Sequence, residues 1–556
     1  MPRASGSPSR NASVVRAAAL CALALVLAGC PGGTGSPGPG GGVLRAVAGG
    51  EVVVAYPYQP TTLNPFVDGG EAPATRDLVR PLMPSLYRLG PGGKRALSLL
   101  EREPAGPDVG GSPFAVRLRL REDAVWSDGQ PITAGDLRFT WQAVMSTPEA
   151  ASRDGYDRIA DVVGESDKVV RLVFKQPFAR WRDLFSAGLG VLPSHALGKT
   201  NIASALHASW PVSGGPYLLK TWTPGLEMVF ERNPKAWGER PLLDRIRVQF
   251  VPDPITALQL YRQGKVDVIA PYAGVDMERR VQGARDGSTV TSDRGDTWAG
   301  LFLDVRDGPL ADVRVRRALA LGVNRAAIVD GLVRSEGELL DAPSAGDPGR
   351  TDPSFTRYAY SASEAESRLA EAGWSQPSDE TEPRRRGGRD LTFTVASVGT
   401  DEVIGRVLRA MNTQAAAVGF DLNLVQLDSE TLWDTWLDGS RFEAAVLIVR
   451  DPPGGGLRAR FGLGGRENVS RLADTRLRGL LDAADATLDD DAAAVDEPFG
   501  RVAELVPVIP LFKLDAVTAA RAGVHEVAAS AAADGFMWNC DRWWIEGGAR
   551  VSPSAS

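Results

Sequence analysis

Histidine and cysteine, the side chains that most often bind metals or act in nucleophilic catalysis, are scarce in this chain. The 556 residues include three of each, which are His195, His207, His525, Cys21, Cys30 and Cys540. No two of them have the spacing of a zinc site, and neither an HExxH nor a CxxC motif occurs. The G-x-S-x-G elbow and the Ser-x-x-Lys pair of two hydrolase classes are absent as well. We therefore predict no metal site, no cofactor and no enzymatic activity, with a secreted hydrolase as the remote alternative.

Cys30 stands out among the cysteines because of the residues that precede it. The first 16 residues carry three arginines and no acid, and an apolar run covers 17–27. This pattern is typical of a signal peptide, and the run is short for a membrane span. It ends in Leu27-Ala28-Gly29-Cys30, which resembles the bacterial lipobox, whose cysteine is lipidated after cleavage. We predict a signal peptide with a lipobox over 1–30 and lipid on Cys30. The alternative is an ordinary secretory signal with a chance cysteine.

Residues 31–42 are rich in Gly, Pro and Ser and are expected to form a flexible tether. A lipidated Cys30 on such a tether predicts an extracytoplasmic protein anchored to the outer face of the cell membrane. The net charge of −7 gives no reason to expect nucleic acid as a partner. The length suggests two or three lobes, and we expect a monomer.

The stretch from Trp126 to Asp136 has the densest local signals. Asp128-Gly129 is a turn pair, Thr133 is a good N-cap, and Asp136 completes a variant of the capping box. We interpret this stretch as a structural corner that leads into a helix. Alternating strands on both sides of it, over 114–120 and 170–174, predict one α+β unit at 96–207.

Further strands and helices are expected on either side of that unit. The first strand is expected over 52–54 and a short helix over 78–89. Residues 246–269 show strand–helix–strand order, and residues 391–449 show the order βαβαβ, with the second helix over 429–437. Such orders predict parallel strands with right-handed crossovers, and hence an α/β fold.

Eight short motifs, in a fixed order, resemble one protein family. They are Thr62-Leu63-Asn64-Pro65, the stretch Trp126 to Asp136, Leu192-Pro193-Ser194-His195, Gly214-Gly215-Pro216-Tyr217, Arg232-Asn233-Pro234, Gly264-Lys265-Val266-Asp267, Val313 to Leu319 with Asn324-Arg325, and Leu369 to Trp374. Together they resemble the family 5, or cluster C, extracytoplasmic solute-binding proteins of peptide and nickel ABC importers. Over about 50–375 the residues themselves match the motifs of the family. Beyond 375 only the order of expected strands and helices matches.

The resemblance implies an α/β, two-lobe periplasmic-binding-protein-like fold (type II, cluster C) with an extra α+β domain inserted in lobe I. A solute is then enclosed between the lobes and passed to permease subunits of an ABC transporter. The segments it implies are lobe I at 43–95, 208–297 and 511–556, the extra domain at 96–207, and lobe II at 298–510.

Peptide-binding relatives hold the solute's ammonium with an acid after the third strand of lobe II. Asp451 is the acid at this position here, but Arg450 adjoins it and glycines follow, so a solvent loop is an equal alternative. Arg450 is expected to pair with Asp451 or to bind a solute carboxylate. The weaker candidates for solute contact are Tyr56, Tyr58, Asn64, Trp298, Trp433 and Trp436.

Two functions follow. The first is a lipid-anchored binding protein that captures a peptide or similar solute for an ABC permease. The second is a lipoprotein with the same fold, a degenerate pocket, and an interaction or signalling role.

Overall fold

The computed structural model describes residues 46–548 apart from short gaps. The gaps are residues 68, 71, 148–149, 151–152, 187, 199, 273–276, 285–286, 334–336, 345–352, 380, 399–401, 429–430, 433–436, 438–441, 452–455, 466 and 489–491. No helix within the described part of the chain is long and apolar enough to cross a membrane.

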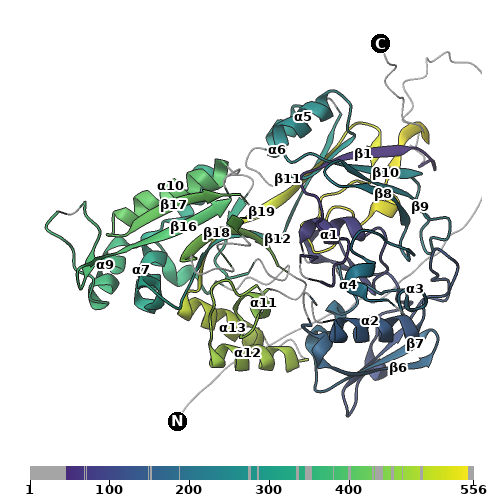
Figure 1. Cartoon of the computed structure of the whole chain (residues 1–556), viewed down its shortest axis with the longest axis horizontal. Coiled ribbons are helices and arrows are strands. Elements are labelled where there is room, and N and C mark those ends of the chain that lie inside the picture. The colour runs from purple at the N-terminus through teal and green to yellow at the C-terminus, as the bar shows by residue number, and fades with distance from the viewer. Residues whose placement is uncertain are drawn as a thin grey trace, which may run out of the picture. The chain divides into compact units, whose positions relative to one another are not determined.

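A mixed eleven-stranded sheet is the backbone of the described part (Figure 1). Its strands in spatial order are β17 (Asp421–Leu427), β16 (Thr392–Val398), β18 (Ala444–Arg450), β12 (Thr289–Leu303), β19 (Val508–Ala520), β11 (Val268–Tyr272), β1 (Glu51–Tyr56), β10 (Arg245–Phe250), β9 (Glu227–Arg232) and β8 (Tyr217–Thr223), with β13 (Gly337–Leu339) beside β19. β16 pairs in parallel with β17 and β18, and β1 pairs in parallel with β10 and β11. The parallel pairings expected from the strand–helix–strand patterns are confirmed.

The helices lie between these strands in the chain. They are α1 (Pro73–Val79), α2 (Ala134–Ser146), α3 (Ser194–Leu197), α4 (Ile202–Ala205), α5 (Pro254–Arg262), α6 (Met277–Gln282), α7 (Val313–Gly322), α8 (Arg325–Ile328), α9 (Ala362–Glu371), α10 (Glu402–Ala416), α11 (Leu457–Phe461), α12 (Thr475–Ala486) and α13 (Ala492–Leu505).

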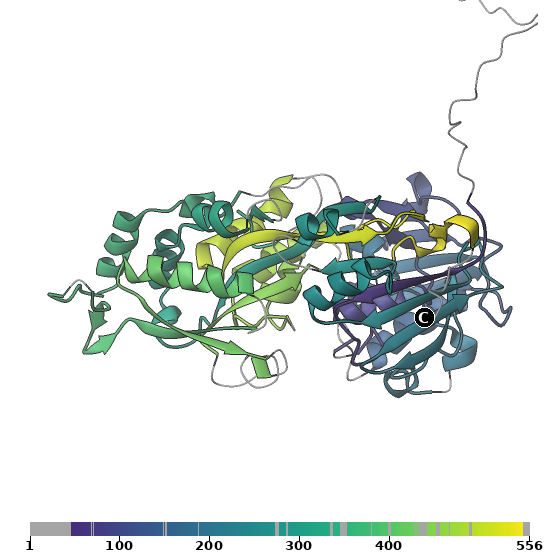
Figure 2. The same ribbon diagram turned by 90° about the horizontal axis from the view of Figure 1, so that it is seen from above.

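Two long antiparallel strands, β12 and β19, belong to both halves of the sheet (Figure 2). They pair from Thr289 with Ala520 to Phe302 with Val508, and the register shifts between Arg294 and Trp298. One end of β12 pairs with β18 and the opposite end of β19 pairs with β11. We call the half with β1 and β8 to β11 lobe I, and the half with β13 and β16 to β18 lobe II.

The apolar cores follow this division. The core clusters of lobe II draw on residues between Trp298 and Leu514. The core clusters of lobe I include residues at the other end of β19, namely Val517, Ala519 and Ala520. The two lobes therefore have separate cores and share a backbone connection through β12 and β19.

A four-stranded sheet, in the order β4-β5-β7-β6, forms the extra domain together with α2. Its strands are β4 (Val109–Gly110), β5 (Ala115–Arg119), β6 (Ile159–Ser166) and β7 (Val169–Phe174). Its apolar side chains, such as Val116 and Leu172, join the core cluster of lobe I. The extra domain and lobe I are therefore one body in packing terms.

The corner before α2 is structural, as interpreted. The Thr133 side chain caps α2, and the Asp136 carboxylate accepts the Thr133 N–H at 2.8 Å, which completes the capping box. The indole N–H of the wholly buried Trp126 donates to the same carboxylate at 3.3 Å.

The prediction of a helix over 78–89 is wrong. The chain forms α1 at Pro73–Val79 and a strand, β2, at Tyr87–Leu89. Pro73 starts the helix because proline has the right φ for the first turn and needs no N–H partner there. The first strand also extends further than expected and ends at Tyr56.

Candidate functional site

Lobe I and lobe II meet at three side chains, which we call the lobe junction: Tyr56, Asp77 and Arg450. Tyr56 ends β1, Asp77 lies in α1, and Arg450 ends β18. One Asp77 oxygen accepts the Tyr56 hydroxyl at 2.8 Å, and the other lies 3.0 Å from Nη1 of Arg450. Asp77 and Tyr56 are wholly buried, and the Arg450 side chain is 11% exposed. The junction is thus a charge-assisted bond between lobes, shielded from solvent.

The phenol of Tyr56 is held in its protonated state. Burial raises its pKa well above the ordinary value, and the negative charge of Asp77 raises it further, while Arg450 acts in the opposite direction. A protonated phenol can donate a hydrogen bond, so Tyr56 is a fixed donor to Asp77.

Aromatic and glycine contacts hold the lobe I side of the junction. The Tyr56 ring stacks on Phe536 with 5.0 Å between ring centroids, and Tyr58 approaches it edge-on at 6.0 Å. Gly535 packs against the carboxylate of Asp77 so closely that a Cβ there would overlap it. Tyr58 is half exposed and remains a candidate for solute contact.

A second buried charge pair supports the lobe II side. Asp451, 1% exposed, accepts the indole N–H of Trp298 at 2.9 Å and the hydroxyl of Ser344 at 2.5 Å. It also pairs with Arg460, whose Nη2 donates to the backbone carbonyl of Arg450 at 2.6 Å. Arg460 therefore holds the end of β18 from which the Arg450 side chain extends.

This arrangement revises the roles predicted for three residues. Asp451 is engaged within lobe II in this structure, and its predicted contact with a solute ammonium gains no support from these bonds. Arg450 pairs with Asp77 across the lobes, whereas the sequence suggested Asp451 as its partner. Trp298, predicted as a candidate for solute contact, lies inside β12, is wholly buried and donates its indole N–H to Asp451.

Asn64 lies in the interior of lobe I. Its side chain donates to the carbonyl of Ile202 at 2.7 Å and accepts the N–H of Phe66 at 3.0 Å. The first bond ties the loop after β1 to α4 and the second holds the loop itself, and neither supports a contact with solute. Trp433, Trp436 and Cys30 fall outside the described residues.

A second set of charges joins the extra domain to lobe II. We call it the ionic clamp; its members are Asp154, Arg158, Arg180, Arg458, Asp482 and Asp485. Across the two bodies, Arg180 Nε lies 2.8 Å from Asp485, and Arg158 Nη2 lies 2.7 Å from Asp482. Both aspartates belong to α12.

Further pairs within each body complete the ionic clamp. Arg458 of α11 lies 2.7 Å from Asp485 and 3.1 Å from Asp482. Burial lowers the pKa of Arg180, but the attraction of Asp154 and Asp485 outweighs burial and raises it overall. Burial alone raises the pKa of Asp482, and the hydrogen bond from Arg158 with the nearby charges brings it below its ordinary value.

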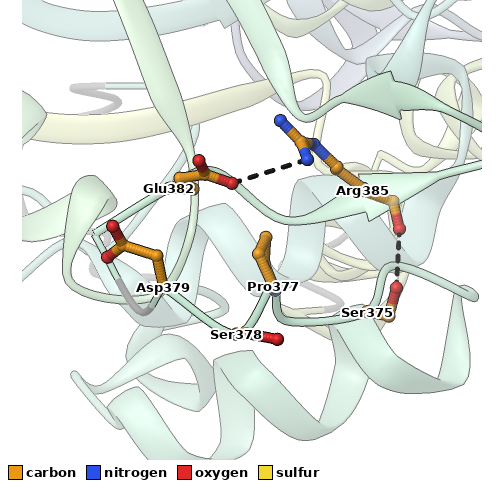
Figure 3. A pocket seen from close by; sticks show the side chains of 6 residues that line it. All are labelled: Ser375, Pro377, Ser378, Asp379, Glu382 and Arg385. Carbon is orange, nitrogen blue, oxygen red and sulfur yellow. Dashed lines mark hydrogen bonds and ion pairs between the residues drawn. The ribbon is translucent and has the colours of Figure 1, made fainter.

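Two surface hollows formed by described residues lie away from these contacts. The hollow in Figure 3 has a volume of about 450 Å³ and is lined by Ser375, Pro377, Ser378, Asp379, Glu382 and Arg385. The other, of about 220 Å³, is lined by Arg317, Arg357, Tyr358 and Arg368. Neither includes a residue of the lobe junction. No group of three His, Cys, Asp or Glu residues in the described ranges is placed to hold a metal ion.

Sequence reasoning missed Asp77 and the ionic clamp. The helix predicted over 78–89 begins one residue after Asp77, so Asp77 was not placed on a helix. Pro73 signals the observed start of α1. Nothing local could have found the clamp, because its arginines and aspartates lie 324 and 305 positions apart in the chain.

Comparison with known proteins shows which family this chain resembles. The profile described as bacterial extracellular solute-binding proteins, family 5 Middle, matches residues 114–448. Protein XP55 of Streptomyces lividans is 26% identical over 507 residues, which cover 87% of this chain and 86% of that protein. The oligopeptide-binding protein OppA of Mycobacterium tuberculosis (strain ATCC 25618 / H37Rv) is 25% identical over 467 residues, with coverage of 80% and 76%.

A solved structure shares the fold. The periplasmic EDTA-binding protein EppA superposes with a TM-score of 0.81 at 22% identity, covering 90% of this chain and 98% of that one. This agrees with the two-lobe α/β fold expected from the sequence.

Proposed function

The chain belongs to family 5 of the bacterial extracellular solute-binding proteins, and from this we propose that it captures a peptide or other small solute between its lobes for the permease of an ABC importer. The observation that carries the proposal is the kind of contact between the lobes. Each lobe has its own apolar core, and the lobes meet through charged bonds at the junction and at the ionic clamp. When the lobes separate, charged groups can bond to water or to a solute, whereas the faces of a shared apolar core would be exposed to water.

Hinge closure is the mechanism we propose. β12 and β19 are the strands that belong to both lobes, and the register of their pairing shifts between Arg294 and Trp298, near the end of the lobe II core. A solute that touches both lobes stabilises the closed state by the contacts that exist only there.

The proposal covers peptides and other small solutes. OppA is named as an oligopeptide-binding protein, and EppA as an EDTA-binding protein. We propose the segments 43–95, 208–297 and 511–556 as lobe I, 96–207 as the extra domain and 298–510 as lobe II. Lipid on Cys30 and the tether over 31–42 hold this binding unit at the outer face of the membrane.

A second candidate function is a lipoprotein that keeps the fold and lacks solute binding. The observation that favours it is Asp451, whose carboxylate is used by Trp298, Ser344 and Arg460.

Solute binding by the purified mature chain decides between the two functions. Native mass spectrometry of the protein as isolated, followed by calorimetry with a peptide pool and with small carboxylates, should reveal a bound solute. Arg450→Gln should lose this binding, whereas Arg385→Gln, at a half-exposed site far along lobe II, should keep it. Persistent absence of any bound solute would favour the second function.

A further inference from the structure

We propose that the smaller of the two surface hollows is an anion site of lobe II, which binds a phosphate group. We call it the arginine hollow; its lining residues are Arg317, Arg357, Tyr358 and Arg368. The inference goes beyond the proposed function, because the arginine hollow shares no residue with the lobe junction or the ionic clamp.

Three neighbouring elements of lobe II supply the arginines. Arg317 belongs to α7 and Arg368 to α9, and these two helices pack against each other (Figure 1). Arg357 belongs to a 3₁₀ turn over Thr356–Tyr358. The tertiary structure therefore brings together three guanidinium groups that are far apart or on different elements in the sequence.

One wall of the arginine hollow is fixed by bonds to the end of α13. Arg317 donates from Nε and Nη2 to the carbonyl of Glu504, at 3.0 and 2.6 Å. The hydroxyl of Tyr358, a residue only 5% exposed, donates to the carbonyl of Ala503 at 2.8 Å. These groups are in place before an anion arrives, which lowers the cost of ordering them on binding.

The phenol of Tyr358 shows that the three charges act on one place. Burial raises its pKa above the ordinary value, and the guanidiniums of Arg317, Arg357 and Arg368 each act in the opposite direction by favouring the phenolate. A negative charge placed in the hollow is therefore favoured by all three arginines together.

The lining of the hollow contains no acidic residue. Two glutamates of the described residues lie close by, and each pairs with an arginine: Glu364 lies 2.6 Å from Arg368, and Glu504 lies 2.7 Å from Arg501. Both are substantially exposed, at 48% and 40%, so solvent weakens their effect inside the hollow. A hollow lined by charges of one sign, above an apolar core, concentrates anions.

A phosphate group suits this arrangement. Each planar guanidinium can donate two parallel hydrogen bonds to phosphate oxygens. A phosphate group has oxygens that point in several directions, so it can accept from more than one arginine at once. Such groups occur free in solution and on the headgroups of anionic phospholipids, and the test has one arm for each source.

The first arm is calorimetry with inorganic phosphate, with sodium chloride at the same ionic strength as the reference. The wild-type protein should bind phosphate at one site and melt at a higher temperature in phosphate than in chloride. Arg357→Gln and Arg368→Gln each remove one guanidinium and should weaken phosphate binding about tenfold or more. Arg478→Gln, at an exposed position of α12 outside the hollow, should bind as wild type does.

The second arm uses the mature chain with Cys30→Ala, so that no lipid on this residue can hold it to a vesicle. It is mixed with phosphatidylcholine vesicles that contain or lack phosphatidylglycerol. Binding that requires phosphatidylglycerol and that Arg357→Gln loses identifies a lipid headgroup as the source, whereas phosphate binding without vesicle binding identifies free phosphate.

Two results would overturn the inference. One is a wild-type protein that binds neither phosphate nor the anionic vesicles. The other is equal binding by wild type, Arg357→Gln and Arg368→Gln, with melting curves that show each variant folded. The proposed function stands in either case, because solute capture is tested at the lobe junction with other ligands.

Discussion

Removing one charge of the ionic clamp should shift the protein toward its open state. The change is Asp485→Asn, which keeps the size of the side chain. Asp485 is 7% exposed and accepts Arg180 Nε at 2.8 Å from the other body, while Arg158 lies 3.9 Å away. Its bond to Arg458 lies within lobe II and is present in both the open and the closed state.

The expected size follows from the bonds that cross between the bodies. A hydrogen bond to a charged group contributes about 1.5–3 kcal/mol, and a neutral one about 0.5–1.5 kcal/mol. Asparagine still accepts from the charged guanidinium of Arg180, so only the attraction between opposite charges is lost; we take this loss as the difference between the two kinds of bond, about 1–1.5 kcal/mol. The closing equilibrium should fall roughly five- to twelvefold, and the apparent solute affinity should fall by a similar factor.

Fluorescence energy transfer between the lobes measures closure directly. Cys540 is buried, so dyes can be attached to cysteines introduced at Lys220 in lobe I and Glu382 in lobe II, both exposed. Asp485→Asn should lower the transfer efficiency, and added salt should reduce the difference between variant and wild type.

The control is a pair of similar exposure inside one lobe. Asp474→Asn weakens the pair with Arg501, and both residues belong to lobe II. It should leave energy transfer and affinity unchanged. If Asp485→Asn also leaves both unchanged, the ionic clamp has no part in closure and the reasoning fails.

Three further predictions concern the support of the junction, pH and anchoring. Asp451→Asn should lower the free energy of unfolding by about 1.5–3 kcal/mol, because it weakens the buried charge-assisted bonds of this carboxylate to Arg460 and Trp298, while Arg460 keeps Glu467 at 3.1 Å; a drop in solute affinity with an unchanged urea midpoint would instead favour direct solute contact. The lowered pKa of Asp482 means that its contribution to closure is present above pH 3.8 and is lost as the pH falls further. Energy transfer should therefore hold from pH 8 to 6 and fall in the acid range, and a loss between pH 8 and 6 would count against the assignment. Cys30→Ala should move the protein from the detergent phase to the aqueous phase of a Triton X-114 partition, and retention in the detergent phase would contradict the lipid anchor.

Local signals predicted much of the fold. The capping box at Thr133 and Asp136, the strand over 114–120 and the parallel order over 391–449 are confirmed because turn chemistry and side-chain alternation act over a few residues. The family resemblance extended these pieces to a two-lobe fold, which the profile match and the likeness to EppA support. The prediction of a helix over 78–89 was wrong because Pro73 starts the helix earlier and residues Tyr87–Leu89 form β2.

The candidate site could be predicted only in part. Arg450 was singled out through the family resemblance and Tyr56 as a candidate for solute contact, but their shared partner Asp77 was missed, and the buried partners of Asp451 give its predicted role no support. By itself the sequence determined which segments become strands, helices and caps, since those choices depend on neighbours along the chain. Only the tertiary structure decided which charges face one another, because β12 and β19 bring lobes together whose charged residues lie hundreds of positions apart.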